Sequence, residues 1–234
     1  MHLAILVTNT DRSAFADRHP KDGEKFSILM HAVRPDWKLS VFEVKDDEFP
    51  DSLALYDGLI LTGSPASVHD GEDWIDRLKK LAVEAYETRQ PMFGACFGHQ
   101  AIAEALGGHV GENPTGWVLG TVEAELVAKP EWEQELPDRL NFYAAHHEQV
   151  LSLPNNAKLI HQQKACKIAG FRIGNDVYTT QYHPEMTHEF VAALTEEISN
   201  DLPEEVIREA TDSLANKSHY LEFAESIARF FEHR

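Results

Sequence analysis

Residues 92–106, MFGACFGHQAIAEAL, carry the pattern that decides the fold. The apolar stretch Met92–Ala95 predicts a buried strand, and Phe97–Leu106 predicts a helix that ends at a pair of glycines. Cys96 lies between them in the spacing Gly-x-Cys-x-Gly, which is the pattern of a nucleophile elbow. The turn from strand to helix is so tight that the flanking positions accept little but glycine. The sequence therefore predicts that Cys96 projects from the carboxyl edge of a sheet at the start of a helix.

That position suits a reactive cysteine. The free N–H groups at a helix N-terminus favour a thiolate over a thiol, and the same groups can stabilise an oxyanion. A buried structural cysteine is the alternative, and the strand context and the two glycines argue against it. Cys166 contrasts with Cys96, because it stands in the sequence ACKI without a glycine or a turn. We expect Cys166 to be a small core residue.

Strands and helices alternate around the elbow. Leu3–Val7, Lys38–Val44 and Gly58–Thr62 predict strands, and apolar residues at helical spacing predict helices over 22–34 and 74–85. This order indicates a mostly parallel sheet covered on both faces. After Gly111 the strand-like segments follow one another with few helices between them, at 121–127, 150–153, 159–163, 168–173 and 177–182. We expect an α/β fold, a three-layer sandwich whose mostly parallel sheet is extended by antiparallel strands.

Composition and charge narrow the functional class. The 234 residues include 21 Lys+Arg and 39 Asp+Glu, a formal net charge of −18, and 43% are hydrophobic. This balance, with no basic patch, argues against binding nucleic acid or an anionic membrane. The longest apolar runs, Leu3–Val7 and Phe190–Leu194, are too short to span a bilayer. Two cysteines and the lack of a signal-peptide pattern predict a cytoplasmic protein of one domain over 1–234, with C-terminal helices in 186–234.

The sequence Tyr182-His183-Pro184-Glu185 supplies a proton acceptor for the thiol, directly after the predicted strand 177–182. Residues i and i+2 of an extended chain point the same way, and a proline at 184 biases His183 toward extended geometry. Glu185 can therefore bind one imidazole nitrogen of His183 while the other nitrogen faces the sulfur. A surface turn is the alternative, and the elbow at Cys96 argues against it.

At these residues the sequence resembles the class I, triad-type glutamine amidotransferases. The resemblance rests on Pro91–Gln100 (PMFGACFGHQ), Gln181–Glu185 (QYHPE) and Leu61–Val68 (LTGSPASV), and Gly107–Gly120 (GGHVGENPTGWVLG) is similar to the stand-alone GMP-synthetase-like branch. It implies a flavodoxin-like amidotransferase fold and a Cys96–His183–Glu185 catalytic triad. It also implies that Cys96 attacks the γ-carboxamide of glutamine to form a γ-glutamyl thioester, and no cofactor is expected.

The resemblance further implies which groups bind the substrate. Backbone N–H groups of Gly63 or Ser64 and of Phe97 would form the oxyanion hole. Gln100 matches the family position that holds the α-amino acid end of glutamine, and His146 lies in a further glutamine-contacting segment.

This last segment, residues 143–148 (YAAHHE), departs from the family pattern. The family often has Ser-His-Gly-Asp there, and His147 and Glu148 replace the glycine and the aspartate. The sequence His146-His147-Glu148 does not predict a metal site, because adjacent strand residues point to opposite faces and no third ligand has suitable spacing.

Two enzymatic functions share this chemistry. One is hydrolysis of glutamine, with ammonia passed to a separate synthetase subunit. The other is hydrolysis or transfer of the γ-glutamyl group of a small peptide such as glutathione, and the motif does not encode the leaving amine. A complete GMP synthetase is not expected, because the sequence has no G-x-x-x-x-G-K-[ST] loop.

Two further functions fit the sequence less well. A non-catalytic regulatory module that keeps the fold would be marked by loss of a triad residue, and all three are present. A protease or chaperone of related fold would usually carry histidine directly after the cysteine, where Phe97 stands.

Overall fold

Five neighbouring strands form the parallel half of the central sheet, in the spatial order β2-β1-β3-β4-β11. The computed structural model describes residues 1–233. The bounds of the five strands are His2–Leu6 (β1), Lys38–Phe42 (β2), Gly58–Leu61 (β3), Met92–Ala95 (β4) and Val177–Thr180 (β11). All residues of β3, β4 and β11 are buried, because helices cover both faces of this half.

The other half of the sheet is antiparallel and continues from β11 in the order β10-β9-β6-β7. Its strands are Val118–Leu126 (β6), Arg139–His146 (β7), Lys158–Gln162 (β9) and Gly170–Ile173 (β10). The structure therefore confirms the predicted α/β fold with a mixed sheet. Strand β7 is missing from the predicted strands, although Leu140, Phe142 and Ala144 alternate toward the core.

A separate two-stranded sheet pairs His109–Glu112 (β5) with Glu148–Ser152 (β8). The sequence predicted a strand at 150–153 but placed it in the main sheet. Pairing partners of this kind depend on contacts between distant residues, which strand periodicity does not encode.

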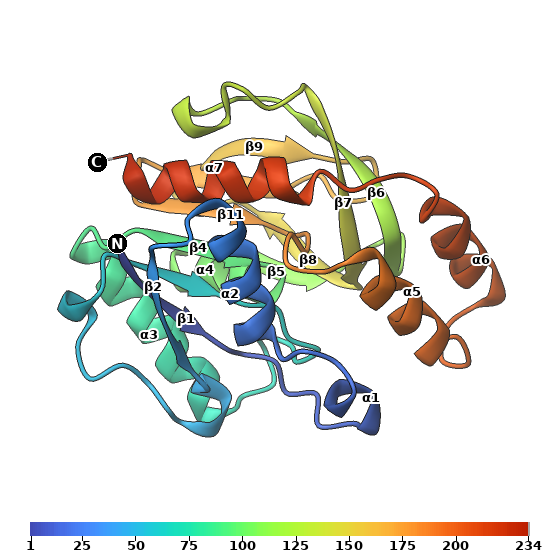
Figure 1. The fold of residues 1–234 in the computed structure, drawn as a ribbon, viewed down its shortest axis with the longest axis horizontal. Coiled ribbons are helices and arrows are strands. Elements are labelled where there is room, and N and C mark those ends of the chain that lie inside the picture. Colours follow the sequence, from blue (N-terminus) through green and yellow to red (C-terminus); the bar gives the residue numbers. More distant parts are fainter. Residues whose placement is uncertain (234) are drawn as a thin grey trace.

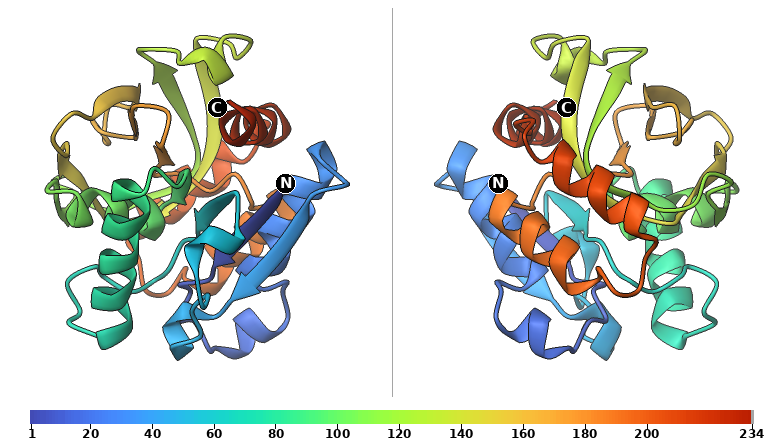
Figure 2. Two further views of the ribbon diagram at one scale, coloured as in Figure 1. Left: turned by 90° about the vertical axis from the view of Figure 1, so that its left-hand side faces the viewer. Right: turned by 90° about the vertical axis from the view of Figure 1, so that its right-hand side faces the viewer.

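Helices cover both faces of the sheet (Figures 1 and 2). Helices α2 (Asp22–Val33) and α7 (Tyr220–Glu232) lie on one face, and α3 (Asp73–Glu87) and α4 (Phe97–Ala105) lie on the other. Each pair buries an apolar stripe against the strands, which divides the core into two large clusters. Among the described residues, none of the helices combines the length and the apolar character needed to cross a membrane.

Three further helices lie near the carboxyl ends of the parallel strands. They are α1 (Ala14–Asp17), α5 (His188–Glu197) and α6 (Glu204–Ser213). Figure 1 shows α1 and α5 on the same side of the molecule, and the rings of Phe15 and Phe190 meet there at 5.7 Å. Arg234, the last residue of the helical region expected over 186–234, lies outside the described residues.

The strand order has a switch point at β1. The chain after β1 leads to β2 on one side, whereas the chain after β2 crosses to β3 on the other side of β1. Open α/β sheets bind ligands outside the carboxyl ends of their strands at such a switch point. The residues that follow β1, β3, β4 and β11 therefore meet at one edge of the sheet.

Candidate active site

Cys96 occupies the predicted elbow between β4 and α4. Its backbone has φ 48° and ψ −108°, a conformation that a residue with a side chain rarely adopts. The Cys96 N–H donates to the carbonyl oxygen of Thr180 at 2.9 Å, and the Gly98 N–H donates to that of Thr62 at 2.9 Å. A Cβ on Gly94 would lie 2.7 Å from the backbone of Gly98, and a Cβ on Gly98 would overlap the carbonyl oxygen of Leu61, so close packing requires both elbow glycines. The Cys96 side chain is 5% exposed.

His183 and Glu185 form a buried pair beside the elbow. The His183 Nδ1–H donates to Glu185 Oε1 at 2.7 Å, and the backbone N–H of His183 donates to the carbonyl oxygen of Tyr143 at 2.9 Å. Each residue is 5% exposed. The second ring nitrogen, Nε2, has no hydrogen-bond partner among the described residues.

Two opposing effects set the protonation of His183. Burial lowers the pKa of the imidazole, whereas the Glu185 carboxylate with its hydrogen bond, and the nearby sulfur of Cys96, raise it. The net result is a pKa well above the usual value for histidine. An imidazolium beside the sulfur is the arrangement that stabilises a thiolate.

The third predicted element, the loop after β3, lies against both Cys96 and His183. A Cβ on Gly63 would lie 2.8 Å from His183 Cε1 and 3.5 Å from Cys96 Cβ. Gly63, Ser64, Cys96 and His183 line one cavity of about 230 Å³. No hydrogen bond among the described residues uses the backbone N–H of Gly63, Ser64 or Phe97. These three N–H groups are therefore available to an oxyanion.

Thr8, which the sequence interpretation missed, fixes the orientation of this loop. It follows β1, is fully buried, and its Oγ1 lies 2.9 Å from the carbonyl oxygen of Gly63 and 3.1 Å from that of Thr62. In a trans peptide the C=O and N–H groups point in opposite directions. Because Thr8 holds both carbonyls on its own side, the N–H groups of Gly63 and Ser64 point away from it.

Known proteins share this sequence and this fold. A profile of the family described as glutamine amidotransferase class-I matches residues 22–193. Gamma-glutamyl peptidase 3 of Arabidopsis thaliana is 30% identical over 172 residues, covering 70% of this chain and 68% of that protein. One subunit of the glutamine-hydrolyzing GMP synthase of Archaeoglobus fulgidus is 28% identical over 165 residues, covering 70% of this chain and 85% of the relative. The chain belongs to the class-I glutamine amidotransferase family.

The fold agrees with that assignment. The solved structure of a glutamine amidotransferase from Thermotoga maritima superimposes with a TM-score of 0.80 at 19% identity, over 99% of this chain and 98% of that one. The resemblance found in the sequence, including that to stand-alone GMP synthase subunits, is confirmed. The enzyme class expected from it, a glutamine amidotransferase or a γ-glutamyl hydrolase, is confirmed at the level of the family.

Two of the predicted substrate-binding residues in this amidotransferase form hydrogen bonds with other residues of the chain. Gln100 Nε2 donates to the carbonyl oxygen of Glu148 at 2.9 Å and lies 3.3 Å from Gln181 Oε1. The Nδ1–H of His146 donates to the same Glu148 carbonyl at 3.0 Å. Burial lowers the pKa of His146 to about 3, so its ring is neutral. Neither Gln100 nor His146 lines the cavity at Cys96.

His147 and Glu148, which differ from the family pattern, contact residues of other segments. Glu148 Oε1 accepts a hydrogen bond from Ser67 Oγ at 3.0 Å, and the ring of His147 lies 4.9 Å from that of Trp117. No group of three potential metal ligands is found in the part of the chain that the structure describes.

Gln181 is a further contact of the nucleophile. Its Nε2 lies 3.7 Å from Cys96 Sγ while its Oε1 faces Gln100, so the two glutamines connect the helix α4 to the sulfur. Cys166 differs from Cys96 as predicted. It is fully buried, and burial raises the pKa of its thiol to about 12.

Proposed function

We propose that this chain cleaves γ-glutamyl amides through a γ-glutamyl thioester on Cys96. The observation that carries the proposal is the buried His183–Glu185 pair, bonded at 2.7 Å, beside a cysteine at a strained elbow. Cys96 is the nucleophile, and His183 transfers the proton. Glu185 orients the imidazole of His183 and stabilises its protonated form.

The chemistry proceeds in two halves. In the first, the Cys96 thiolate adds to the γ-carbonyl carbon, and the oxyanion meets the N–H groups of Gly63 or Ser64 and Phe97. The C–N bond then breaks, and the leaving nitrogen takes the proton from His183 Nε2. In the second, water adds to the thioester and gives a proton to His183. The C–S bond breaks, which releases glutamate and regenerates the thiolate.

Gln100 and His146 contribute by holding a backbone segment. Both donate to the carbonyl oxygen of Glu148, so we assign them to the positioning of the segment 145–148 against the glutamyl group. One catalytic domain over residues 1–234 is part of the proposal, because Phe190 and Leu194 of α5 line the cavity at Cys96.

Two leaving groups fit this chemistry. Ammonia from glutamine, delivered to a separate synthetase subunit, is supported by the similarity to the GMP synthase component of Archaeoglobus fulgidus. A larger amine is supported by the similarity to gamma-glutamyl peptidase 3 and by the cavity of about 230 Å³ that His183 lines.

The test is to compare the purified protein with its Cys96→Ala and Cys166→Ser variants. Glutamate release is measured with glutamine and with γ-glutamyl amides, and a covalent γ-glutamyl adduct is sought by mass spectrometry after rapid acid quench. We expect Cys96→Ala to abolish both signals and Cys166→Ser to retain them. Equal losses in the two variants, or turnover by Cys96→Ala, would overturn the proposal.

A further inference from the structure

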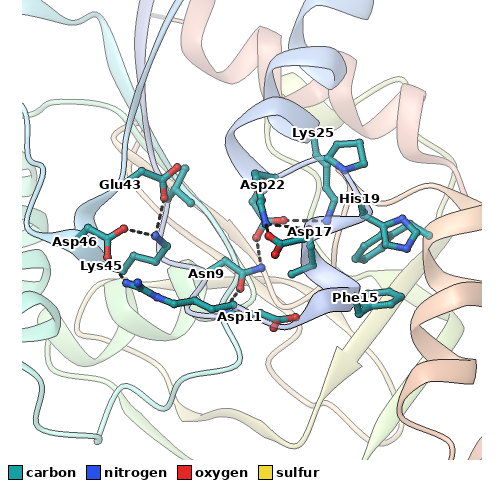
Figure 3. A pocket seen from close by; sticks show the side chains of 16 residues that line it. Asn9, Asp11, Phe15, Asp17, His19, Asp22, Lys25, Glu43, Lys45 and Asp46 are labelled. Atoms are coloured by element: carbon teal, nitrogen blue, oxygen red, sulfur yellow. Dashed lines mark hydrogen bonds and ion pairs between the residues drawn. The ribbon is translucent and has the colours of Figure 1, made fainter.

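A second cavity adjoins the one at Cys96. It has a volume of about 310 Å³ and lies between the loop after β1, helix α1 and the chain after β2 (Figure 3). The two cavities share six lining residues, which are Asn9, Asp11, Phe15, Asp22, Lys25 and Phe190. Together they fall within the ~300–1,000 Å³ of a small-molecule site, which the cavity at Cys96 alone does not reach.

The position of His183 indicates where the leaving amine lies in this space. The nitrogen that leaves must sit beside the imidazole that protonates it, and His183 opens into the cavity at Cys96. Gly63 and Ala145, which we place beside the glutamyl group, line the same cavity, so the glutamyl group and the start of the amine share it. The body of the amine therefore extends from His183 toward Lys25 and the second cavity.

The lining of the two cavities changes from apolar to charged with distance from Cys96. Beside Cys96 they are mainly apolar, with Trp117, Met186, Phe190, Leu194 and Ile198. The second cavity is lined by carboxylates and cationic side chains in nearly equal number, although acidic residues far outnumber basic ones in the whole chain. Figure 3 shows Lys45 beside Glu43 and Asp46 on one side of the cavity and Lys25 beside Asp22 on the other.

A buried ion pair marks the junction of the two cavities. Lys25 Nζ lies 3.0 Å from Asp22 Oδ1 and 3.5 Å from the centroid of the Phe190 ring. Lys25 is 9% exposed and Asp22 is 5% exposed, and Asn9 donates to the second oxygen of Asp22 at 2.7 Å. An ammonium has three N–H donors, so Lys25 can bind a second carboxylate while it keeps Asp22. Asp22 and Asp11 present the opposite charge beside it.

We infer that the leaving amine is the end of an apolar stem that carries an amino acid head. The stem of several methylenes lies along Phe190 and Leu194, and the zwitterionic head reaches the mixed charges around Lys25. A γ-glutamyl group linked to the ε-nitrogen of lysine has this structure. The inference rests on the proposed γ-glutamyl chemistry and adds the class of amine that it releases.

The experiment compares four γ-glutamyl substrates by the kcat/KM of glutamate release. They are γ-glutamyl-ε-lysine, γ-glutamyl-n-pentylamide with the stem alone, γ-glutamylglycine with a carboxylate alone, and glutamine. We expect kcat/KM for the ε-lysine compound to exceed that for each of the others at least about tenfold, the effect of one charge-assisted contact. Similar values for the ε-lysine compound and the pentylamide would refute the assignment of the head.

Variants connect the preference to the cavity. In Lys25→Met, the ratio of kcat/KM for the ε-lysine compound to that for the pentylamide should fall about tenfold. The matched control is Lys80→Met on the exposed side of α3, which should keep the ratio. If Lys25→Met fails to fold, the double variant Asp22→Asn, Lys25→Met removes the whole ion pair and should show the same fall. An unchanged ratio in a folded variant would refute the role of Lys25.

The fate of the glutamyl group separates the two proposals. If glutamine is cleaved as well as the ε-lysine compound and Cys96 carries the γ-glutamyl adduct, the amine site is wrong and the thioester chemistry stands. If none of the four substrates yields glutamate or an adduct, both are wrong.

Discussion

Replacing Thr8 by valine tests how the oxyanion hole is held. The substitution keeps the shape of a fully buried side chain and removes the hydroxyl that lies 2.9 Å from the Gly63 carbonyl oxygen. That carbonyl keeps a weaker contact with Thr62 Oγ1 at 3.2 Å, and the Thr62 carbonyl keeps the N–H of Gly98 at 2.9 Å. The free energy of unfolding should fall by about 1–3 kcal/mol, the usual effect of leaving a buried polar group without its partner.

Activity should fall further than stability alone explains. Loss of one oxyanion donor lowers kcat ~10²–10³-fold. Thr8→Val only loosens the peptide groups that carry the donors, so its effect on kcat should not exceed this range. We expect kcat of Thr8→Val to fall about tenfold to a hundredfold, with KM changed less than about threefold. Thr8→Ser keeps the hydroxyl and should retain kcat. Steady-state glutamate release and urea unfolding measure the two effects, and a Thr8→Val protein with reduced stability and normal kcat would refute the reasoning.

Three further predictions concern charge and space at the site. Glu185→Gln removes the charge that raises the pKa of His183 against the effect of burial. The imidazolium then loses its proton at a lower pH, so the alkaline limb of the kcat/KM profile should shift to lower pH. An unmoved limb would show that Glu185 does not set this pKa. Gly63→Ala places a methyl group 2.8 Å from His183 Cε1, so kcat should fall at least about tenfold while circular dichroism stays that of the wild type. His99 and His146 have pKa values lowered to about 3, chiefly by burial, so their contribution to stability is complete above their unfolded pKa of ~6.5 and declines as the pH falls toward 3. Urea unfolding should show a slope that approaches about 1.4 kcal/mol per pH unit for each ring below pH 6, and a slope unchanged by His146→Gln would contradict this.

The parts of the site that the sequence predicted are those set by local pattern. Glycines two residues on either side of Cys96 are required by a tight turn, and the spacing of His183 and Glu185 follows from extended backbone. Both patterns lie within a few residues of the group they position. Thr8 carries no such pattern, because its partners are 54 and 55 residues away, and a buried threonine at the end of a strand has many ordinary uses.

Long-range contacts also decide what the sequence left open about the strand pairing and about the surroundings of the predicted substrate-binding residues. The sequence marks 150–153 as a strand but not its pairing with β5, which depends on residues about forty positions away. Resemblance placed Gln100 next to the substrate, whereas its amide is occupied by Glu148 and Gln181. The junction at Lys25 depends on Phe190, and neither residue stands in a recognisable motif.

The order of strands in the sheet explains why these groups can act together. Thr8, Gly63, Cys96 and His183 follow β1, β3, β4 and β11, which are neighbours in that order. Each group therefore lies beside the group on which it acts. Thr8 hydrogen-bonds to the carbonyl of Gly63, and His183 lines the same cavity as Cys96. Beyond Thr8 the chain continues into the loop and helix α1 that enclose the second cavity. An insertion or exchange of that loop would alter the amine site while Gly63, Cys96 and His183 keep their places, because they are fixed by strands and not by the loop.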